Sequence, residues 1–279
     1  MAARRFNLSK EELERLYWEE GKSIKEIANI HGVHATTIHR WMIKYNIPRR
    51  IIETPSDKMK RVKIDKRLIE LVDGLLLSDG TLSKPNPKHR HVNSRLRIPQ
   101  RADRIEWLNW IKGFLIERRI KVNLVTNEER SFTDPRNGKI YVTQPQYLLY
   151  TEHLPFFREQ YQRWYPNGEK HVPIDINLSP LTLAQWYMGD GSLSFRTGHG
   201  RTHAIFFYTY DFTEQECDFL GNKLKEKYGF NIKTYKRSNR KYKGKEIYIS
   251  GKRDVLRFLE MTRPYMVDCF AYKWWPILK

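Results

Sequence analysis

The chain has 279 residues with 40% hydrophobic side chains, which is enough for a folded interior and excludes a largely disordered protein. Its formal net charge of +19 at pH 7 favours a polyanionic partner, above all nucleic acid, because each phosphate neutralised by Lys or Arg releases condensed counterions. No apolar run approaches the roughly 20 residues that a membrane-spanning helix needs, and the two cysteines lack metal-binding spacing. We therefore expect an intracellular, nucleic-acid-binding protein that does not enter a membrane.

Residues 7–48 show the pattern of three short helices. Two of these helices begin with a predicted capping box, in which a serine and a glutamate three residues later bond each other's backbone amides. The two pairs are Ser9 with Glu12 and Ser23 with Glu26. A tight turn at Gly32 leads into the third helix, over residues 35–45. Residues 49–63 are basic with little periodicity, which predicts a linker that lies along the DNA backbone.

The segment 1–48 resembles a helix-turn-helix domain. Ala28, Gly32 and Ile38 stand at the spacing of that motif, where a small residue permits helix contact, a glycine takes the turn and an apolar residue anchors the recognition helix. The residues predicted to face DNA from the recognition helix are Thr36, Thr37, His39, Arg40 and Lys44. The alternative is a three-helix module that contacts only protein.

From about residue 64 onward the chain repeats its own order of elements, in two halves at 64–173 and 174–279. The sequence of each half predicts the same elements: an apolar helix ending in Asp-Gly, an extended segment, an amphipathic helix, a strand pair and a final helical stretch. The predicted segments of the first half are 68–80, 94–98, 103–119, and 122–126 paired with 139–143. Those of the second half are 181–191, 203–210, 213–228, and 231–236 paired with 246–250.

The two Asp-Gly helices carry the chemistry. Small residues four apart, Gly74 and Ser78 in the first helix with Gly189 in the matching place of the second, allow two helix backbones to approach closely. Asp79 and Asp190 would then lie at the negative ends of two helix dipoles, which costs about 0.3–1 kcal/mol each unless cations compensate. Hydrolysis of a phosphodiester uses divalent metals in this setting, and oxygen ligands beside phosphate indicate Mg²⁺, with Mn²⁺ as a substitute.

A single Asp-Gly turn at the end of a buried helix is commonplace and has no functional meaning by itself. Two such turns, in matching places of a duplicated and very basic chain, favour a shared chemical role. Here the sequence resembles the LAGLIDADG homing endonucleases that carry both motifs in one chain, over about residues 64–276. Lys170-His-Val-Pro173 before the second motif and Tyr272-Lys273 near the end add to the likeness. Leu77 and Gly189 depart from it, because they replace a variable acid of the motif, and Gln185 replaces a packing glycine.

The resemblance implies an α+β fold: two αββαββα halves form a pseudo-dimer, and each lays a curved antiparallel sheet into the major groove. It also implies that Lys170 and Lys273 serve the two active sites, where a lysine stabilises developing negative charge or polarises the attacking water. The strand residues predicted to face DNA are Arg95, Arg97, Lys233, Tyr235, Arg237 and Arg240. Arg95 and Arg97 alternate with apolar neighbours, as expected for a strand with one wet face. Whether these side chains contact bases or phosphates stays open.

The function predicted on these grounds is a site-specific double-strand DNA endonuclease that acts as a monomer on a long asymmetric target. Two alternatives use the same fold: an intron RNA maturase, and a DNA-binding regulator that does not cleave. Asp79 and Asp190 distinguish cleavage from simple binding, because an acid beside phosphate repels DNA and is of no use to a protein that only binds it.

Overall fold

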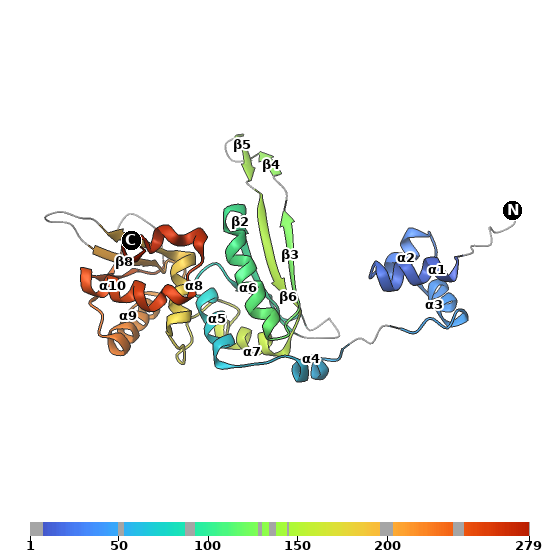
Figure 1. Cartoon of the computed structure of the whole chain (residues 1–279), viewed down its shortest axis with the longest axis horizontal. Coiled ribbons are helices and arrows are strands. Elements are labelled where there is room, and N and C mark those ends of the chain that lie inside the picture. The colour runs from blue at the N-terminus through green and yellow to red at the C-terminus, as the bar shows by residue number, and fades with distance from the viewer. Residues whose placement is uncertain are drawn as a thin grey trace. The chain divides into compact units, whose positions relative to one another are not determined.

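The computed structural model describes residues 8–49, 53–86, 93–127, 130–133, 138–143, 145–195, 203–236 and 243–278. The chain divides into two compact units, Met1–Glu53 and Thr54–Lys279 (Figure 1). Each unit has its own hydrophobic core.

The smaller unit is a three-helix module around a compact apolar core. Its elements are α1 (Lys10–Glu14), which continues as the π-helical turn η1 (Arg15–Glu19), then α2 (Ile24–Ile30) and α3 (Ala35–Lys44). Ala28 and Ile38 are buried in its core, and Gly32 has a φ of +63°, a left-handed turn conformation that favours glycine. Ser23 forms the predicted capping box with Glu26.

At α1 the capping-box prediction is only half right. Ser9 accepts a hydrogen bond from the amide of Glu12, as predicted, but the reciprocal bond, from the amide of Ser9 to the side chain of Glu12, does not form. A start with only one of the two bonds leaves an amide to solvent, which an exposed helix tolerates.

The expected linker 49–63 is not irregular throughout, because it contains helix α4 (Pro55–Arg61). Thr54 and Asp57 form a capping box at its start. None of its residues is buried, so it has no apolar periodicity to detect. The helix is held to the rest of the larger unit by charge, since Lys58 and Arg61 both pair with Glu152, and by Met59, which packs against the hydrophobic core.

The larger unit confirms the predicted duplicated α+β fold (Figure 1). The first half consists of α5 (Lys66–Leu76), β1 (Thr81–Leu82), β2 (Leu96–Arg101), α6 (Ile105–Glu117), β3 (Val122–Asn127), β6 (Gln146–Thr151) and α7 (Pro155–Trp164). The second half consists of α8 (Pro180–Asp190), β7 (Gly191–Phe195), β8 (His203–Tyr208), α9 (Glu214–Tyr228), β9 (Ile232–Tyr235), β10 (Glu246–Ser250) and α10 (Lys252–Thr262). The antiparallel sheets have the equivalent orders β1-β2-β6-β3 and β7-β8-β10-β9.

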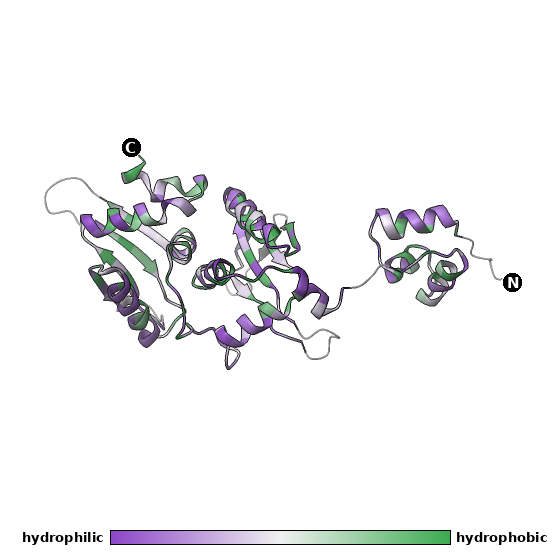
Figure 2. Cartoon of the chain, turned by 60° about the horizontal axis from the view of Figure 1, so that its bottom comes forward, coloured by the Kyte–Doolittle hydropathy of each residue, from purple (hydrophilic) through white to green (hydrophobic). Residues whose placement is uncertain are grey.

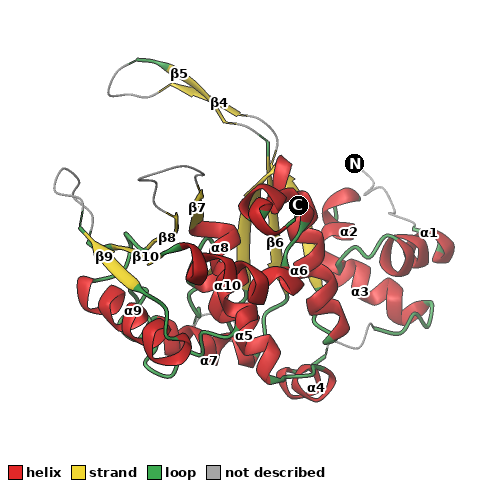
Figure 3. Ribbon diagram, turned by 60° about the vertical axis from the view of Figure 1, so that its left-hand side comes forward, coloured by secondary structure: helices red, strands yellow, loops and turns green. Residues whose placement is uncertain are grey.

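One predicted strand pair is wrong. Segment 139–143 does not pair with segment 122–126, because β3 pairs with β6 instead. The segment forms β5 (Ile140–Thr143), which pairs with β4 (Arg130–Thr133) in a separate two-stranded sheet that extends beyond the first sheet (Figure 3). Ile140 is 71% exposed, so its strand propensity reflects local conformation and not a place in the core. The corresponding pair in the second half, β9 with β10, forms as predicted.

Helices α5 and α8 pack side by side at the centre of the larger unit and join the two halves into one hydrophobic core. A Cβ added to Gly74 would lie 2.5 Å from the carbonyl oxygen of Thr182, and one added to Gly189 would lie 2.5 Å from Cβ of Ser78. The backbones are therefore as close as the small residues predicted. Gln185 does not prevent this approach, because its buried side chain turns aside to accept a hydrogen bond from Nε1 of Trp107 at 2.8 Å. Among the described residues, no helix is both long and apolar enough to cross a membrane.

Candidate active site

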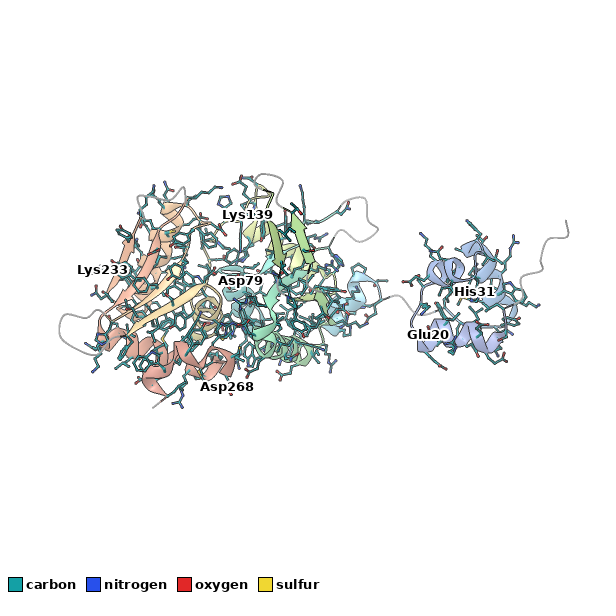
Figure 4. All side chains as sticks on the ribbon, turned by 90° about the horizontal axis from the view of Figure 1, so that it is seen from above. Glu20, His31, Asp79, Lys139, Lys233 and Asp268 are labelled. Atoms are coloured by element: carbon teal, nitrogen blue, oxygen red, sulfur yellow. The ribbon has the colours of Figure 1, made fainter. Side chains whose placement is uncertain are left out.

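The two motif aspartates lie where α5 and α8 come to an end. Asp190 is the last residue of α8 and is half-buried. The sequence predicted that Asp79 would end its helix, and this is wrong. Helix α5 stops at Leu76, and Asp79 follows in a turn, exposed to solvent. Oδ2 of Asp79 accepts a hydrogen bond of 2.7 Å from Nε2 of Gln100, on β2. Figure 4 shows Asp79 in the middle of the larger unit, between the two sheets.

The close helix packing brings the two acids together. Oδ2 of Asp79 lies 3.5 Å from where a Cβ on Gly189 would stand, and Asp190 is the next residue in the chain. Burial, and then the negative charge of Asp79, raise the pKa of Asp190 to about 7. The two carboxylates thus share a small space in which their like charges repel each other.

Lys170 lies beside the first motif. Its Nζ donates to the carbonyl oxygens of Ser78 and Gly80, both at 3.2 Å, so its positive charge sits on the turn that carries Asp79. Burial lowers the pKa of Lys170 to about 8, although the nearby carboxylate of Asp190 acts in the opposite direction.

Lys273 occupies the equivalent place at the second motif and is bound more completely. Its Nζ donates to the carbonyl oxygens of Tyr187, Met188 and Gly191, at 2.9, 2.8 and 2.7 Å. The lysine is only 6% exposed, and burial, followed by the charge of Arg104, lowers its pKa to about 8. Each lysine therefore places a positive charge at the negative end of a motif helix.

Two further polar residues approach these groups, and neither was predicted from the sequence. Gln100 reaches Asp79 from the end of β2, and Asp211, after β8, lines a hollow that it shares with Lys170 and Asp190. Both residues reach the site only through the sheet fold. Their local sequence has no motif that marks them, because proximity to the aspartates depends on how the strands pair.

The donor set suits a hard divalent cation. Two carboxylates and backbone carbonyl oxygens are present, and the described part of the chain holds no cluster of three or more His, Cys, Asp or Glu side chains that could enclose a metal. Such a site leaves most coordination positions to water and phosphate, which is how Mg²⁺ is usually bound. The repulsion between Asp79 and Asp190, which Lys170 and Lys273 offset only in part, would be relieved by a cation between them.

The predicted strand residues lie on the outer faces of the two sheets where they are described. Arg97 is exposed between the buried Leu96 and Ile98, and Arg95 lies with its guanidinium 4.5 Å from the ring centre of Tyr150. In the second sheet, Lys233 and Tyr235 are exposed on β9, where Figure 4 labels Lys233. Arg237 and Arg240 lie outside the described residues.

The five predicted residues of α3 are all at least partly exposed to solvent. Thr36, Arg40 and Lys44 are exposed, and Thr37 and His39 are half-buried. The ammonium of Lys44 lies over the ring of the preceding Trp41, and the hydroxyl of Thr36 is 2.9 Å from the ring nitrogen Nδ1 of His34, the N-cap of α3.

The profile of the LAGLIDADG DNA endonuclease family matches residues 69–255, which includes both motif helices and most of both sheets. The chain belongs to this family. Its LAGLIDADG fold is also similar to a solved structure, the homing endonuclease I-WcaI bound to its DNA recognition sequence, with a TM-score of 0.61 and 19% identity. That match covers 78% of this chain and 89% of the other and shows a shared fold.

Two relatives extend the LAGLIDADG comparison. An uncharacterized protein of Methanocaldococcus jannaschii is 29% identical over 257 residues, which covers 92% of each chain. An alignment of that length has to include α3, so the relative shares sequence with both compact units. A cytochrome b mRNA maturase of Debaryomyces hansenii is 30% identical over 218 residues, covering 75% of this chain and 74% of the relative.

Proposed function

We propose that the chain is a metal-dependent endonuclease that makes a double-strand break in a long, asymmetric DNA target. The observation that carries this proposal is the pair of acids, Asp79 and Asp190, which two tightly packed helices hold close together with a lysine on the backbone of each helix end. Both acids belong to one chain, so a monomer has the groups for both strands. The two halves differ in sequence, so the half-sites they recognise differ as well.

Asp79 and Asp190 are the residues that would hold Mg²⁺, or Mn²⁺ in its place. When bound, such ions activate water and stabilise the departing oxygen of a phosphodiester. The two lysines add positive charge where phosphate oxygens become more negative.

The lysines differ in what else they can do. An ammonium group has three N–H donors. Lys273 uses all three on backbone carbonyls, so it acts by its charge alone. Lys170 uses two, within the described part of the chain, and keeps one donor for a water or a phosphate oxygen.

We assign DNA contact to the outer sheet faces and, in the smaller unit, to a helix-turn-helix formed by α2 and α3. Arg95, Arg97, Lys233 and Tyr235 would approach the major groove from the sheets, and we keep Arg237 and Arg240 as candidates beside them. Thr36, Thr37, His39, Arg40 and Lys44 would approach DNA from α3. The net charge of +19 and the DNA-bound state of the similar I-WcaI support this assignment.

The test is cleavage of a supercoiled plasmid that carries the DNA from both sides of the gene. The two flanks are joined directly, as in an allele that lacks the gene. We expect linear product with Mg²⁺ or Mn²⁺, no product in EDTA, and loss of linear product in Asp79→Asn and Asp190→Asn. Asp175→Asn is a matched control, because Asp175 is a surface acid outside both motif helices and pairs with Arg163. Tight binding of this DNA without any cut in either metal would show that the chain is a regulator instead.

A maturase activity is the second candidate, and the identity with the Debaryomyces hansenii maturase is what favours it. The same basic sheets would then bind a folded intron. Splicing of the host intron transcript, measured with wild type and with the Asp79→Asn/Asp190→Asn double variant, separates the two activities. Assisted splicing that survives in the double variant would assign RNA binding to the fold and cleavage to the acids.

A further inference from the structure

The outer faces of the two sheets differ at one matched row of residues. In the first sheet the row crosses β1, β2, β6 and β3 as Thr81, Arg97, Tyr150 and Asn123. In the second sheet it crosses β7, β8, β10 and β9 as Ser192, Phe206, Tyr248 and Lys233. Each row begins at the residue after the motif glycine, with a hydroxyl side chain, and has a tyrosine in third place. The rows are therefore equivalent, and their second place holds an arginine in one half and a phenylalanine in the other.

Arg97 and Phe206 both point away from the helices that cover their sheets. The residues before them, Leu96 and Ile205, are fully buried, so the alternation of the strand turns the next side chain outward. Arg97 is exposed and has no ion-pair partner among the residues that the structure describes. The ring centre of Phe206 lies 5.3 Å from that of Tyr248. Phe206 also lines two hollows in the surface of the second half.

The sheet around Phe206 is also less basic than the sheet around Arg97. The strands β7–β10 contain one lysine and one glutamate, and the glutamate, Glu246, is buried and bonded to the hydroxyl of Tyr210. The hollow beside Phe206 is lined by Ala204, Tyr235 and Tyr248 and, among charged or titratable residues, by His203, Lys233 and Glu246. Figure 2 shows the strands of the second sheet mostly in the colour of hydrophobic residues. In the first sheet, β2 adds a second exposed arginine, Arg101, to Arg97.

We infer that Arg97 and Phe206 are equivalent specificity-determining residues that read different bases: Arg97 a guanine, and Phe206 the methyl group of a thymine. The inference rests on the proposed function, because it assumes that the sheet faces lie in the major groove. It predicts a G·C pair at one position of the target and an A·T pair at the matching position of the other half-site.

The chemistry of the major groove supports both assignments. Guanine presents two acceptors that an arginine fork bonds at once, and thymine presents a methyl group that apolar side chains contact. Phe206 has no hydrogen-bonding group, so the methyl is the one feature of a base edge that it can bind favourably. The ring of Tyr248 holds Phe206 in place, and a side chain that is held in advance loses less conformational entropy on binding.

The first experiment is selection of bound duplexes from a randomised double-stranded DNA pool. The Asp79→Asn/Asp190→Asn variant keeps bound duplexes intact, and wild type in EDTA serves as a second binding form. We expect one half-site with G and the other with T at matched distances from the centre. Arg97→Phe should remove the preference for G, which corresponds to about a 5- to 150-fold loss of discrimination. Phe206→Arg should convert the preference for T into one for G.

The second experiment replaces thymine by uracil in the selected duplex, which removes only the methyl group. At the Phe206 position we expect binding about fourfold weaker, the effect of one buried methyl group. The same replacement should have no effect on Phe206→Ala. Uracil at thymines in the half-site of Arg97 is the matched control for the DNA, and there Phe206→Ala should change nothing.

The outcomes separate the inference from the proposed function. If duplexes are enriched and cleaved, but the base preference is absent at these positions or is unchanged by the substitutions, the inference is wrong while the nuclease assignment stands. If uracil weakens binding equally in wild type and Phe206→Ala, the methyl is read by another residue and the inference is again wrong. If neither protein form enriches any duplex, the proposed function fails and the inference with it.

Discussion

The two halves of the larger unit present the same acid in different surroundings. Asp79 lies beyond its helix, exposed, and is held by a neutral amide from Gln100. Asp190 ends its helix, is half-buried, and faces Asp79 together with a shared hollow that includes Asp211. Duplication has kept the helix contact and the lysine on each helix end, while the shell around each acid has diverged. A symmetric backbone thus holds two acids in chemically unequal surroundings, and under the proposed function the two strands of a target would be cut at different rates.

The largest effect should come from the two lysines, and it should differ between them. Lys170→Met is expected to slow cleavage by about 10²–10³-fold, because it removes a charge and a free donor beside the reacting phosphate, and to lower the melting temperature only slightly, because it breaks two part-buried bonds. Lys273→Met should show a similar loss together with a lower melting temperature, since it deprives three buried carbonyl oxygens of their donor.

Plasmid cleavage resolved into nicked and linear products, with thermal melting of each variant, checks this prediction. Equal melting temperatures for the two variants would contradict the proposed difference, in which Lys273 uses all three donors on carbonyl oxygens and Lys170 keeps one free.

The next effect concerns the glycines that set the helix contact. Gly74→Ala should destabilise the protein by about 1–3 kcal/mol, because the new Cβ meets backbone atoms of Thr182. Gly189→Ala should cost a similar amount, because its Cβ meets Cβ of Ser78, which cannot rotate away, and adding Ser78→Gly should restore part of the loss. Gly113→Ala in α6 is the control: nothing lies within 4 Å of its Cβ, so a gain of about 0.5–1 kcal/mol is expected.

Urea unfolding of the full chain measures these differences. If Gly74→Ala is as well tolerated as Gly113→Ala, the two motif helices have room to separate and the acids are less firmly placed than we infer.

A third effect is on pH dependence. The pKa of Asp190 is raised to about 7, so below this pH the carboxyl group is protonated and does not coordinate a cation. Mn²⁺ affinity should therefore fall by up to about tenfold per pH unit as the pH drops below 7. Asp190→Asn should bind more weakly at neutral pH and show a flatter dependence, while Asp79→Asn should keep the slope but shift it to lower pH, because the neighbouring charge is gone.

Calorimetric titration with Mn²⁺ from pH 5.5 to 8 checks this. An affinity that stays constant over that range in wild type would contradict it.

The smallest effect should be that of Gln100→Ala. Its hydrogen bond to Asp79 is charge-assisted, so the substitution removes about 1.5 kcal/mol of interaction energy. We therefore expect cleavage of one strand to slow roughly tenfold. Since no described residue makes the equivalent contact to Asp190, nicked plasmid should accumulate before linear product. Equal slowing of both strands would mean that Gln100 acts on the whole site and not on the Asp79 side alone.

Much of this fold was predictable because its signals are local. Helical periodicity, two Asp-Gly helix ends and the order of strands repeat along the chain, and each can be read without knowing what lies opposite. Pairing is different: Ile140–Thr143 has the composition of a strand, but nothing in it says whether its partner is β3 or β4. The short β1 and β7 were missed for a similar reason, since Thr81–Leu82 and Gly191–Phe195 form strands only where β2 and β8 are there to pair with them.

The candidate site shows the same limit. The acids and lysines stand in matched motifs, whereas Gln100 and Asp211 become neighbours only after the sheets have folded. A buried ion pair was also beyond prediction: Asp73, inside the first motif, is fully buried and bonded to Arg163 on α7, with one oxygen 3.1 Å from Nη2. Sequence indicates an acid in an apolar helix, and only the tertiary contact explains how its charge is tolerated.

The closeness of α5 and α8 has a consequence for how the protein can change. The spacing of the two acids is set where main chains touch, and not by long side chains that could adopt other rotamers. Substitutions on the outer sheet faces, such as those at Arg97 and Phe206, lie on different elements from this contact. Apart from Gln100, which reaches Asp79 from the strand of Arg97, the spacing of the acids and the proposed choice of target rest on different contacts, so a new target could be acquired without moving the helix contact.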